Sequence, residues 1–180
     1  MPSLSDKLKS LGVKTGAEIR PPAAPKPTRG TPIEAVFPNG QKPSGRALLT
    51  RRGEAFVVED TYIADYRHGQ APIRLEAALG TLAAWAVDER ISRLSLSDLA
   101  FLDTETSGLS GGTGTYAFMV GVGRFMDGEF RLAQFFMRDP GEEAAMLEAI
   151  ADFIAPCAAL VTYNGKAFDA PLLRTRYTLH

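Results

Sequence analysis

Two carboxylates separated by one residue, Asp103 and Glu105, stand at the end of an apolar run that is typical of a buried strand. Because side chains alternate across a strand, both carboxylates are expected to face the same way. Two unpaired anions side by side would repel each other and be poorly solvated, so the pattern favours a divalent cation between them. The small, glycine-rich stretch 107–115 that follows would let a large substrate approach closely.

A third acid, Asp169, lies at a predicted junction between a strand and a helix. The short apolar strand 160–163 ends in an Asn-Gly pair, and a helix is expected to begin around Asp169. In open α/β sheets, ligands usually bind beyond the carboxyl ends of the strands. If the two strands are neighbours in such a sheet, the Asp169 carboxylate can meet the two carboxylates of the first stretch.

These stretches resemble the first two motifs of the DEDD exonucleases in the ribonuclease H-like superfamily. Residues 103–109, Asp-Thr-Glu-Thr-Ser-Gly-Leu, resemble the first motif, and residues 163–169, Tyr-Asn-Gly-Lys-Ala-Phe-Asp, resemble the second. The run 103–116 and the ending 171–177 are most similar to the YprB-type ribonuclease H-like domain. The resemblance covers roughly the second half of the chain. It implies a metal-dependent 3′-5′ exonuclease that acts on single-stranded or frayed nucleic-acid ends.

The chemistry that this resemblance implies is phosphodiester hydrolysis with two Mg²⁺ or Mn²⁺ ions about 3.5 to 4 Å apart. Hard divalent ions prefer oxygen ligands, which suits an all-carboxylate set and a chain without a Cys or His cluster. By motif position, Asp103 would bridge both ions, Glu105 would bind the ion on the nucleophile side, and Asp169 would bind the other, partly through water. The residues implied to border the terminal nucleotide are Thr104, Thr106, Gly108, Leu109, Asn164 and Phe168.

Structural explanations stand beside some of these roles. Leu109 and Phe168 occupy apolar positions of their elements, where packing in the core is at least as good an explanation. Lys166 could contact a phosphate, but a lysine in a turn is more often simply solvated. A strand-end capping arrangement would account for one acidic motif, but it would not account for two motifs in this order.

The expected fold class is α/β, with a ribonuclease H-like mixed sheet and flanking helices in residues 91–180. The superfamily's fold continues with a fifth strand and a further helix that carry a fourth carboxylate and often a His or Tyr base. The sequence ends at His180 before such elements, so we expect a C-terminally incomplete domain, weak or inactive alone. The alternative function is a non-catalytic nucleic-acid-binding or scaffolding module. The predicted elements are strands 99–104, 115–126, 129–138 and 158–163, a hairpin turn at Asp127-Gly128, and helices 140–154 and 169–179.

The first half of the chain predicts two further regions. Residues 1–32 hold five prolines between positions 20 and 32 and are expected to form a flexible basic tail. Residues 33–90 are expected to form a small ancillary region, with short antiparallel strands, including 46–50 and 54–59, followed by a helix at 72–90.

Composition and charge limit the class of protein. A hydrophobic content of 45% and a charged content of 23% are those of a globular protein, and no apolar run approaches the ~18 to 20 residues of a membrane helix. The N-terminus lacks a secretory signal, so a cytoplasmic protein without a membrane partner is expected. Residues 1–52 carry a balance of +7 and the remainder −8, which fits a phosphate-binding arm or a merely solvated tail equally well. Nothing in the sequence chooses between DNA and RNA.

Overall fold

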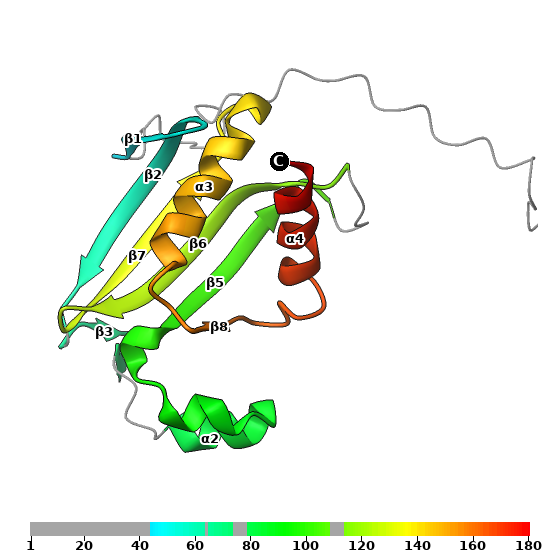
Figure 1. The fold of residues 1–180 in the computed structure, drawn as a ribbon. Coiled ribbons are helices and arrows are strands. Elements are labelled where there is room, and N and C mark those ends of the chain that lie inside the picture. Colours follow the sequence, from blue (N-terminus) through cyan, green and yellow to red (C-terminus); the bar gives the residue numbers. More distant parts are fainter. Residues whose placement is uncertain (1–43, 64, 74–78, 109–113) are drawn as a thin grey trace, which may run out of the picture. The chain divides into compact units, whose positions relative to one another are not determined.

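A six-stranded mixed sheet dominates the computed structural model, which describes residues 44–63, 65–73, 79–108 and 114–180. The strand order is β1-β2-β7-β6-β5-β8, and helices α3 and α4 flank this sheet (Figure 1). A second, two-stranded sheet pairs β3 (Arg67–His68) with β4 (Ala71–Pro72). The expected α/β class, a mixed sheet with flanking helices, is confirmed. The expected flexible tail, residues 1–32, lies outside the described residues.

The centre of the sheet is an antiparallel meander of β5 (Leu99–Thr106), β6 (Ala117–Met126) and β7 (Glu129–Phe136). The turn between β6 and β7 is Asp127-Gly128, and both residues have positive φ angles, 55° and 79°. Such a pair forms the type I′ turn whose twist matches that of the adjoining strands. The predicted strands and their hairpin turn are therefore confirmed, with bounds that shift by two residues or fewer.

The short strand β8 (Ala159–Val161) runs parallel to β5 at the edge of the sheet. Leu99, Ala100 and Phe101 of β5 pair with the three residues of β8. Because parallel strands have their carboxyl ends on the same edge, the segment after β8 emerges near the acidic end of β5. The two strands are therefore neighbours, which is the condition set above for Asp169 to meet Asp103 and Glu105.

The hairpin of β1 (Arg46–Thr50) and β2 (Gly53–Tyr62) belongs to the same sheet. This hairpin of the expected ancillary region 33–90 joins the main sheet, because β2 pairs with β7 from Phe56 to Tyr62. Ala55 and Val57 are completely buried and contribute to the central core. The hairpin therefore extends the main sheet and shares its core instead of forming a core of its own.

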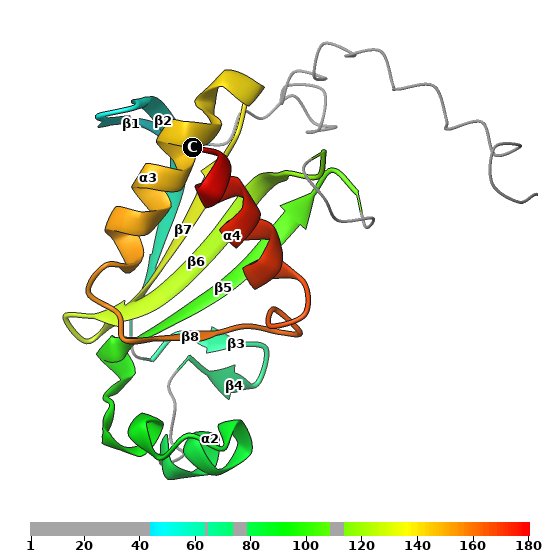
Figure 2. The same ribbon diagram turned by 45° about the vertical axis from the view of Figure 1, so that its right-hand side comes forward.

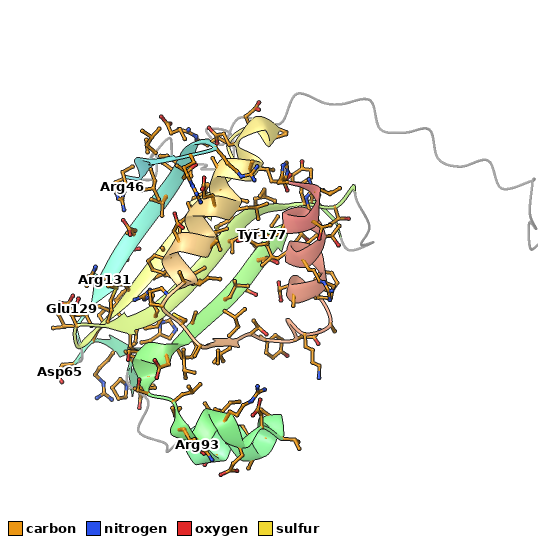
Figure 3. The ribbon with its side chains drawn as sticks, viewed as in Figure 1. Arg46, Asp65, Arg93, Glu129, Arg131 and Tyr177 are labelled. Atoms are coloured by element: carbon orange, nitrogen blue, oxygen red, sulfur yellow. The ribbon has the colours of Figure 1, made fainter. Side chains whose placement is uncertain are left out.

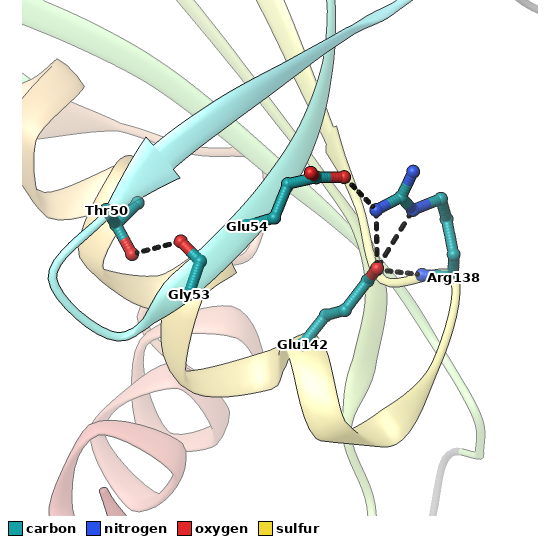
Figure 4. Close-up of polar contacts among 5 residues, drawn as sticks. All are labelled: Thr50, Gly53, Glu54, Arg138 and Glu142. Atoms are coloured by element: carbon teal, nitrogen blue, oxygen red, sulfur yellow. Dashed lines mark hydrogen bonds and ion pairs between the residues drawn. The ribbon is translucent and has the colours of Figure 1, made fainter.

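Arg138, which follows β7, ties this hairpin to the start of the next helix (Figure 4). Its guanidinium donates to Glu54 of β2 at 2.8 Å and to Glu142 at 2.5 Å. Within the hairpin, the Thr50 hydroxyl donates to the Gly53 carbonyl at 2.9 Å. Such exposed ion pairs contribute at most about 1 kcal/mol each, so burial of the apolar face provides most of the stability.

Helices α3 (Glu143–Ile154) and α4 (Asp169–Leu179) cover one face of the sheet (Figure 2). A short 3-10 turn, η5 (Pro140–Glu142), precedes α3, and the Asp139 side chain caps it by accepting from the Gly141 amide at 2.8 Å. Both predicted helices are confirmed. The core between sheet and helices holds, among others, Ala100, Leu102, Val120, Val122, Ala133 and Phe135 from the strands and Met146, Ile150, Leu172 and Leu173 from the helices.

The helix predicted at 72–90 is wrong in extent, since α2 spans only Leu79–Ala86. Pro72 belongs to β4, and residues 74–78 lie outside the described residues. Val87 has a φ angle of 54°, which ends the helix, and the Asp88 side chain then caps a 3-10 turn at Glu89–Arg93. Across the described ranges, no helix has the combination of length and apolar character that crossing a membrane requires.

Candidate functional site

Asp103 and Glu105 project from the exposed side of β5. On the same strand, Ala100 and Leu102 are buried under the helices, whereas both carboxylates are exposed. The pairing of β5 with β6 is regular through Glu105, so the alternation of side chains holds over this stretch. The two carboxylates therefore lie together near the carboxyl end of β5, on the face of the sheet that α3 and α4 do not cover.

A hollow of about 510 Å³ lies on this open face beside Asp103. The strand register places Asp103 opposite Gly121 of β6, and Gly121 opposite Gln134 of β7. All three residues line the hollow, together with Tyr163 from the segment after β8. Asp103 thus borders a space that is open to solvent and large enough for a small organic group.

Asp169 occupies a different environment, on the covered side of the sheet. It is the first residue of α4, is only 5% exposed, and accepts a hydrogen bond from the Thr104 hydroxyl. Thr104 lies between Asp103 and Glu105 in β5, so its side chain points to the opposite face from theirs. A carboxylate at the start of a helix is also favoured by the helix dipole. The structure therefore pairs Asp169 with Thr104 and does not bring it to the other two carboxylates.

The expected meeting of three carboxylates is accordingly not found. Within the part of the chain that the structure describes, no group of three His, Cys, Asp or Glu side chains is arranged to hold a metal ion. Asp103 and Glu105 do fit a hard divalent cation, since they are exposed oxygen ligands on one face. Asp169, which accepts from Thr104 on the covered face, is not part of that pair. The difference arises because the rotation of α4 against the sheet decides which face Asp169 reaches.

The loop after β5 begins with two local hydrogen-bonded contacts. The Thr106 hydroxyl donates to the Gly108 carbonyl at 3.1 Å. The Ser107 amide donates to the Tyr116 carbonyl at 2.9 Å, and the Tyr116 amide donates to the Ser107 hydroxyl at 3.2 Å. These bonds hold the predicted border residues Thr106 and Gly108 directly beyond Glu105. Leu109, also predicted to border the nucleotide, lies outside the described residues.

The second motif forms a tight turn between β8 and α4. Asn164 is exposed and has a φ angle of 57°, a conformation that asparagine tolerates better than most residues. Gly165 is buried, and any Cβ there would overlap the Thr162 side chain. The Gly165 carbonyl accepts from the Ala170 amide at 2.8 Å, which joins the turn to the start of α4. Phe168 is 38% exposed, so it is not sealed in the core and remains accessible to a ligand.

A buried ion-pair cluster fixes the other end of α4 to the start of α3. Glu143, 4% exposed, accepts hydrogen bonds from the Arg176 guanidinium and lies 2.9 Å from His180 Nε2. Burial alone would raise the pKa of Glu143, but the hydrogen bonds from Arg176 and His180 outweigh it and hold that pKa below its usual range. The cluster sets the position of α4 and hence that of Asp169.

Tyr177 reinforces this helix pairing, and Figure 3 shows its side chain between α4 and α3. Its hydroxyl donates to the Leu147 carbonyl at 2.8 Å. Burial, with a smaller contribution from the Asp152 charge, raises the pKa of Tyr177 to about 12. The hydroxyl therefore stays protonated and donates throughout the neutral range.

Several residues of the open face were not among the predicted site residues, among them Gly121, Gln134 and Tyr163. Gly121 and Gln134 belong to strands that read as ordinary apolar segments, and only the register of three strands places them beside Asp103. Tyr163 belongs to the second motif but had no predicted role. Its 93% exposure, unusual for a large aromatic side chain, could not be read from its apolar strand context.

Comparison with known proteins places the second half of the chain in a family context. Residues 100–180, which contain both acidic motifs, match the family described as the RNase H superfamily. A segment of 83 residues is 41% identical to the uncharacterized protein YprB of Bacillus subtilis (strain 168). That match covers 46% of this chain and 20% of YprB, so the chain spans only about a fifth of the length of YprB.

Proposed function

We propose that the protein is a nuclease that hydrolyses phosphodiester bonds of nucleic acid with divalent metal ions, weak or inactive as this chain alone, because residues 100–180 match the RNase H superfamily and a segment of 83 residues is similar to YprB. The match to the RNase H superfamily suggests a nuclease-like function and a nucleic-acid partner. In its finer form, the proposal is a cytoplasmic 3′-5′ exonuclease that acts on single-stranded or frayed ends. The match to YprB supports the domain type but adds no substrate.

The observation that carries the proposal is the exposed pair of carboxylates at the end of β5. Asp103 and Glu105 share the open face, and Asp103 borders a hollow that could admit part of a substrate. Two like charges held this close are best stabilised by a cation between them. A structural role for the pair is harder to support, because carboxylates exposed on an open sheet face add nothing to the core.

Mg²⁺ or Mn²⁺ is the cofactor that this ligand chemistry favours. Asp103 and Glu105 would hold the first ion, and Asp169 would complete a site for two ions after leaving Thr104. The chemistry that two such ions supply when bound is activation of a water and neutralisation of charge at the scissile phosphate. Thr104, Thr106, Gly108, Leu109, Asn164 and Phe168 are proposed to border the terminal nucleotide.

Hydrolysis of a labelled single-stranded oligonucleotide in Mg²⁺ tests this proposal. Asp103→Asn should lower the rate at least roughly 100-fold, because loss of even an indirect metal partner costs 10- to 100-fold. The free energy of unfolding should change little, since the substitution relieves carboxylate repulsion. Asp65→Asn, at an exposed position near the opposite end of the sheet, is the matched control and should keep the full rate (Figure 3). Equal rates for Asp103→Asn and wild type would remove Asp103 from the mechanism.

A non-catalytic nucleic-acid-binding module is the second candidate function. It is favoured by the hydrogen bond between Thr104 and Asp169, which keeps the third carboxylate on the covered face. The same assay separates the two functions. Oligonucleotide binding without hydrolysis, in wild type and Asp103→Asn alike, would support the binding module, whereas hydrolysis that Asp103→Asn abolishes would support the nuclease.

A further inference from the structure

Two rows of side chains cross the open face of the sheet, and each row has a glycine in its middle. One row is Asp103 on β5, Gly121 on β6 and Gln134 on β7. The neighbouring row is Phe101, Gly123 and Leu132 on the same three strands. Because glycine has no side chain, the sheet surface is depressed at β6 along both rows, between the side chains that project from β5 and β7.

The two glycine positions differ in what lies above them. The Phe130 ring lies directly over Gly123, so that any Cβ at Gly123 would overlap it. Nothing lies within 4 Å of a Cβ placed at Gly121. The Phe130 side chain therefore fills the space above Gly123. The space above Gly121 is open and belongs to the hollow of about 510 Å³.

The walls of this hollow are formed by aromatic and aliphatic side chains, and Asp103 and Gln134 are polar residues at its edges. Phe101 and Phe130 line it with their rings packed edge to face, 6.1 Å apart between centroids. The Asp103 carboxylate and the Gln134 amide stand on opposite sides of Gly121. Tyr163, almost fully exposed, lines the hollow from the segment after β8 and offers a further ring face.

This chemistry suits a flat heteroaromatic group with hydrogen-bonding edges. The Gln134 amide can both donate and accept hydrogen bonds, as in the recognition of base edges. Among the described residues that line the hollow there is no Lys or Arg that could bind a phosphate. The base of a nucleotide, rather than its phosphate, is thus the group that matches.

We propose that the hollow over Gly121 binds one nucleobase of the substrate, with its ring against Phe130 and its edge at Gln134, next to the metal ion that Asp103 would hold. This inference rests on the proposed nucleic-acid function and adds the position of a base to it. Stacking of a base on an aromatic side chain is worth about 1–3 kcal/mol. The hollow would therefore contribute measurable affinity even without hydrolysis.

Gly121→Val tests the proposal by filling the hollow. The substitution fits the space above Gly121, and a β-branched residue suits a strand, so the fold should be retained and the melting temperature should not fall. The probe is a single-stranded oligonucleotide with a fluorescent 2-aminopurine base at its 3′ end, whose emission falls on stacking. Wild type should quench the probe, and Gly121→Val should weaken its binding at least tenfold. Gly80→Ala, which adds a methyl group at an open position on α2, is the control and should bind as wild type does.

Gln134→Leu is a second variant, in which a side chain of similar size replaces glutamine and the amide is removed. It should reduce the difference in affinity between probes that end in different bases, while general binding is kept. Unchanged binding by Gly121→Val would overturn the base site. If Asp103→Asn still abolished hydrolysis in that case, the nuclease proposal would stand without it. Wild-type protein that neither binds nor hydrolyses the oligonucleotide would overturn both proposals.

Discussion

Thr104→Val probes the contact that decides on which face of the sheet Asp169 lies. Valine has nearly the shape of threonine but cannot donate a hydrogen bond, so the substitution removes one donor and little volume. The Asp169 carboxylate, 5% exposed, would lose the hydroxyl that now donates to it. Water can replace this donor only poorly at a buried site, so the loss should appear in the free energy of unfolding.

The expected cost follows from the charge and burial of the acceptor. Hydrogen bonds to charged groups contribute about 1.5–3 kcal/mol, and leaving a buried acceptor unsatisfied costs a similar amount. We therefore expect Thr104→Val to lower the free energy of unfolding by about 2 kcal/mol. With a urea dependence of about 2 kcal/mol per molar, the unfolding midpoint should fall by roughly 1 M.

Urea unfolding of wild type, Thr104→Val and Thr104→Ser is the assay. Thr104→Ser keeps the hydroxyl and should recover most of the stability, apart from the loss of one methyl group. A double-mutant cycle with Asp169→Ala should give a coupling energy of about 1–2 kcal/mol, because the two side chains act as one unit. If Thr104→Val were as stable as wild type and the coupling were near zero, Asp169 would not be held on the covered face. A less stable Thr104→Val that binds Mg²⁺ more tightly would instead support the movement that the nuclease proposal requires.

Two further predictions concern the attachment of α4 to α3. The native pKa of Glu143 lies below its ordinary value of 4.5, so its contribution to stability is complete above about pH 4.5 and is lost as the pH falls through the native pKa. Glu143→Gln should therefore be less stable than wild type at pH 7, because Arg176 loses its buried partner. In urea titrations at pH 4 and 3, the difference in the free energy of unfolding between the two proteins should shrink. A difference that stays constant with pH would contradict this. Tyr177→Phe should cost about 1 kcal/mol through loss of the bond to the Leu147 carbonyl. Because the native pKa of Tyr177 is raised to about 12, that difference should shrink from pH 10 to pH 12 in thermal unfolding, and equal stability of the two proteins at pH 7 would show that the bond contributes nothing.

The carboxylate pair illustrates how far local sequence pattern reaches. Asp103 and Glu105 alternate with residues of a buried strand, and this periodicity places both on one face without further information. The hairpin at Asp127-Gly128 and the start of α4 at Asp169 are likewise set by residues within a few positions along the chain. Each of these features was predictable because its cause is local.

The same locality explains what the sequence did not predict. The β1-β2 hairpin has the pattern of an antiparallel pair, but its attachment to β7 depends on residues 68 to 80 positions away. The helix expected at 72–90 ends at Ala86 because Val87 adopts a left-handed conformation that its residue type disfavours. The hollow over Gly121 appears only when the register of three strands aligns Asp103 with Gln134.

By itself, the sequence determined the α/β class, the order of the central strands and helices, and the shared face of Asp103 and Glu105. Only the tertiary structure decided that Asp169, the first residue of α4, pairs with Thr104 on the covered face of the sheet. The physical reason is that strand periodicity assigns a face within one element, whereas the rotation and position of a helix on a sheet result from the packing of its whole buried side. For α4, that packing includes Leu172, Leu173 and the ion pair of Arg176 with Glu143.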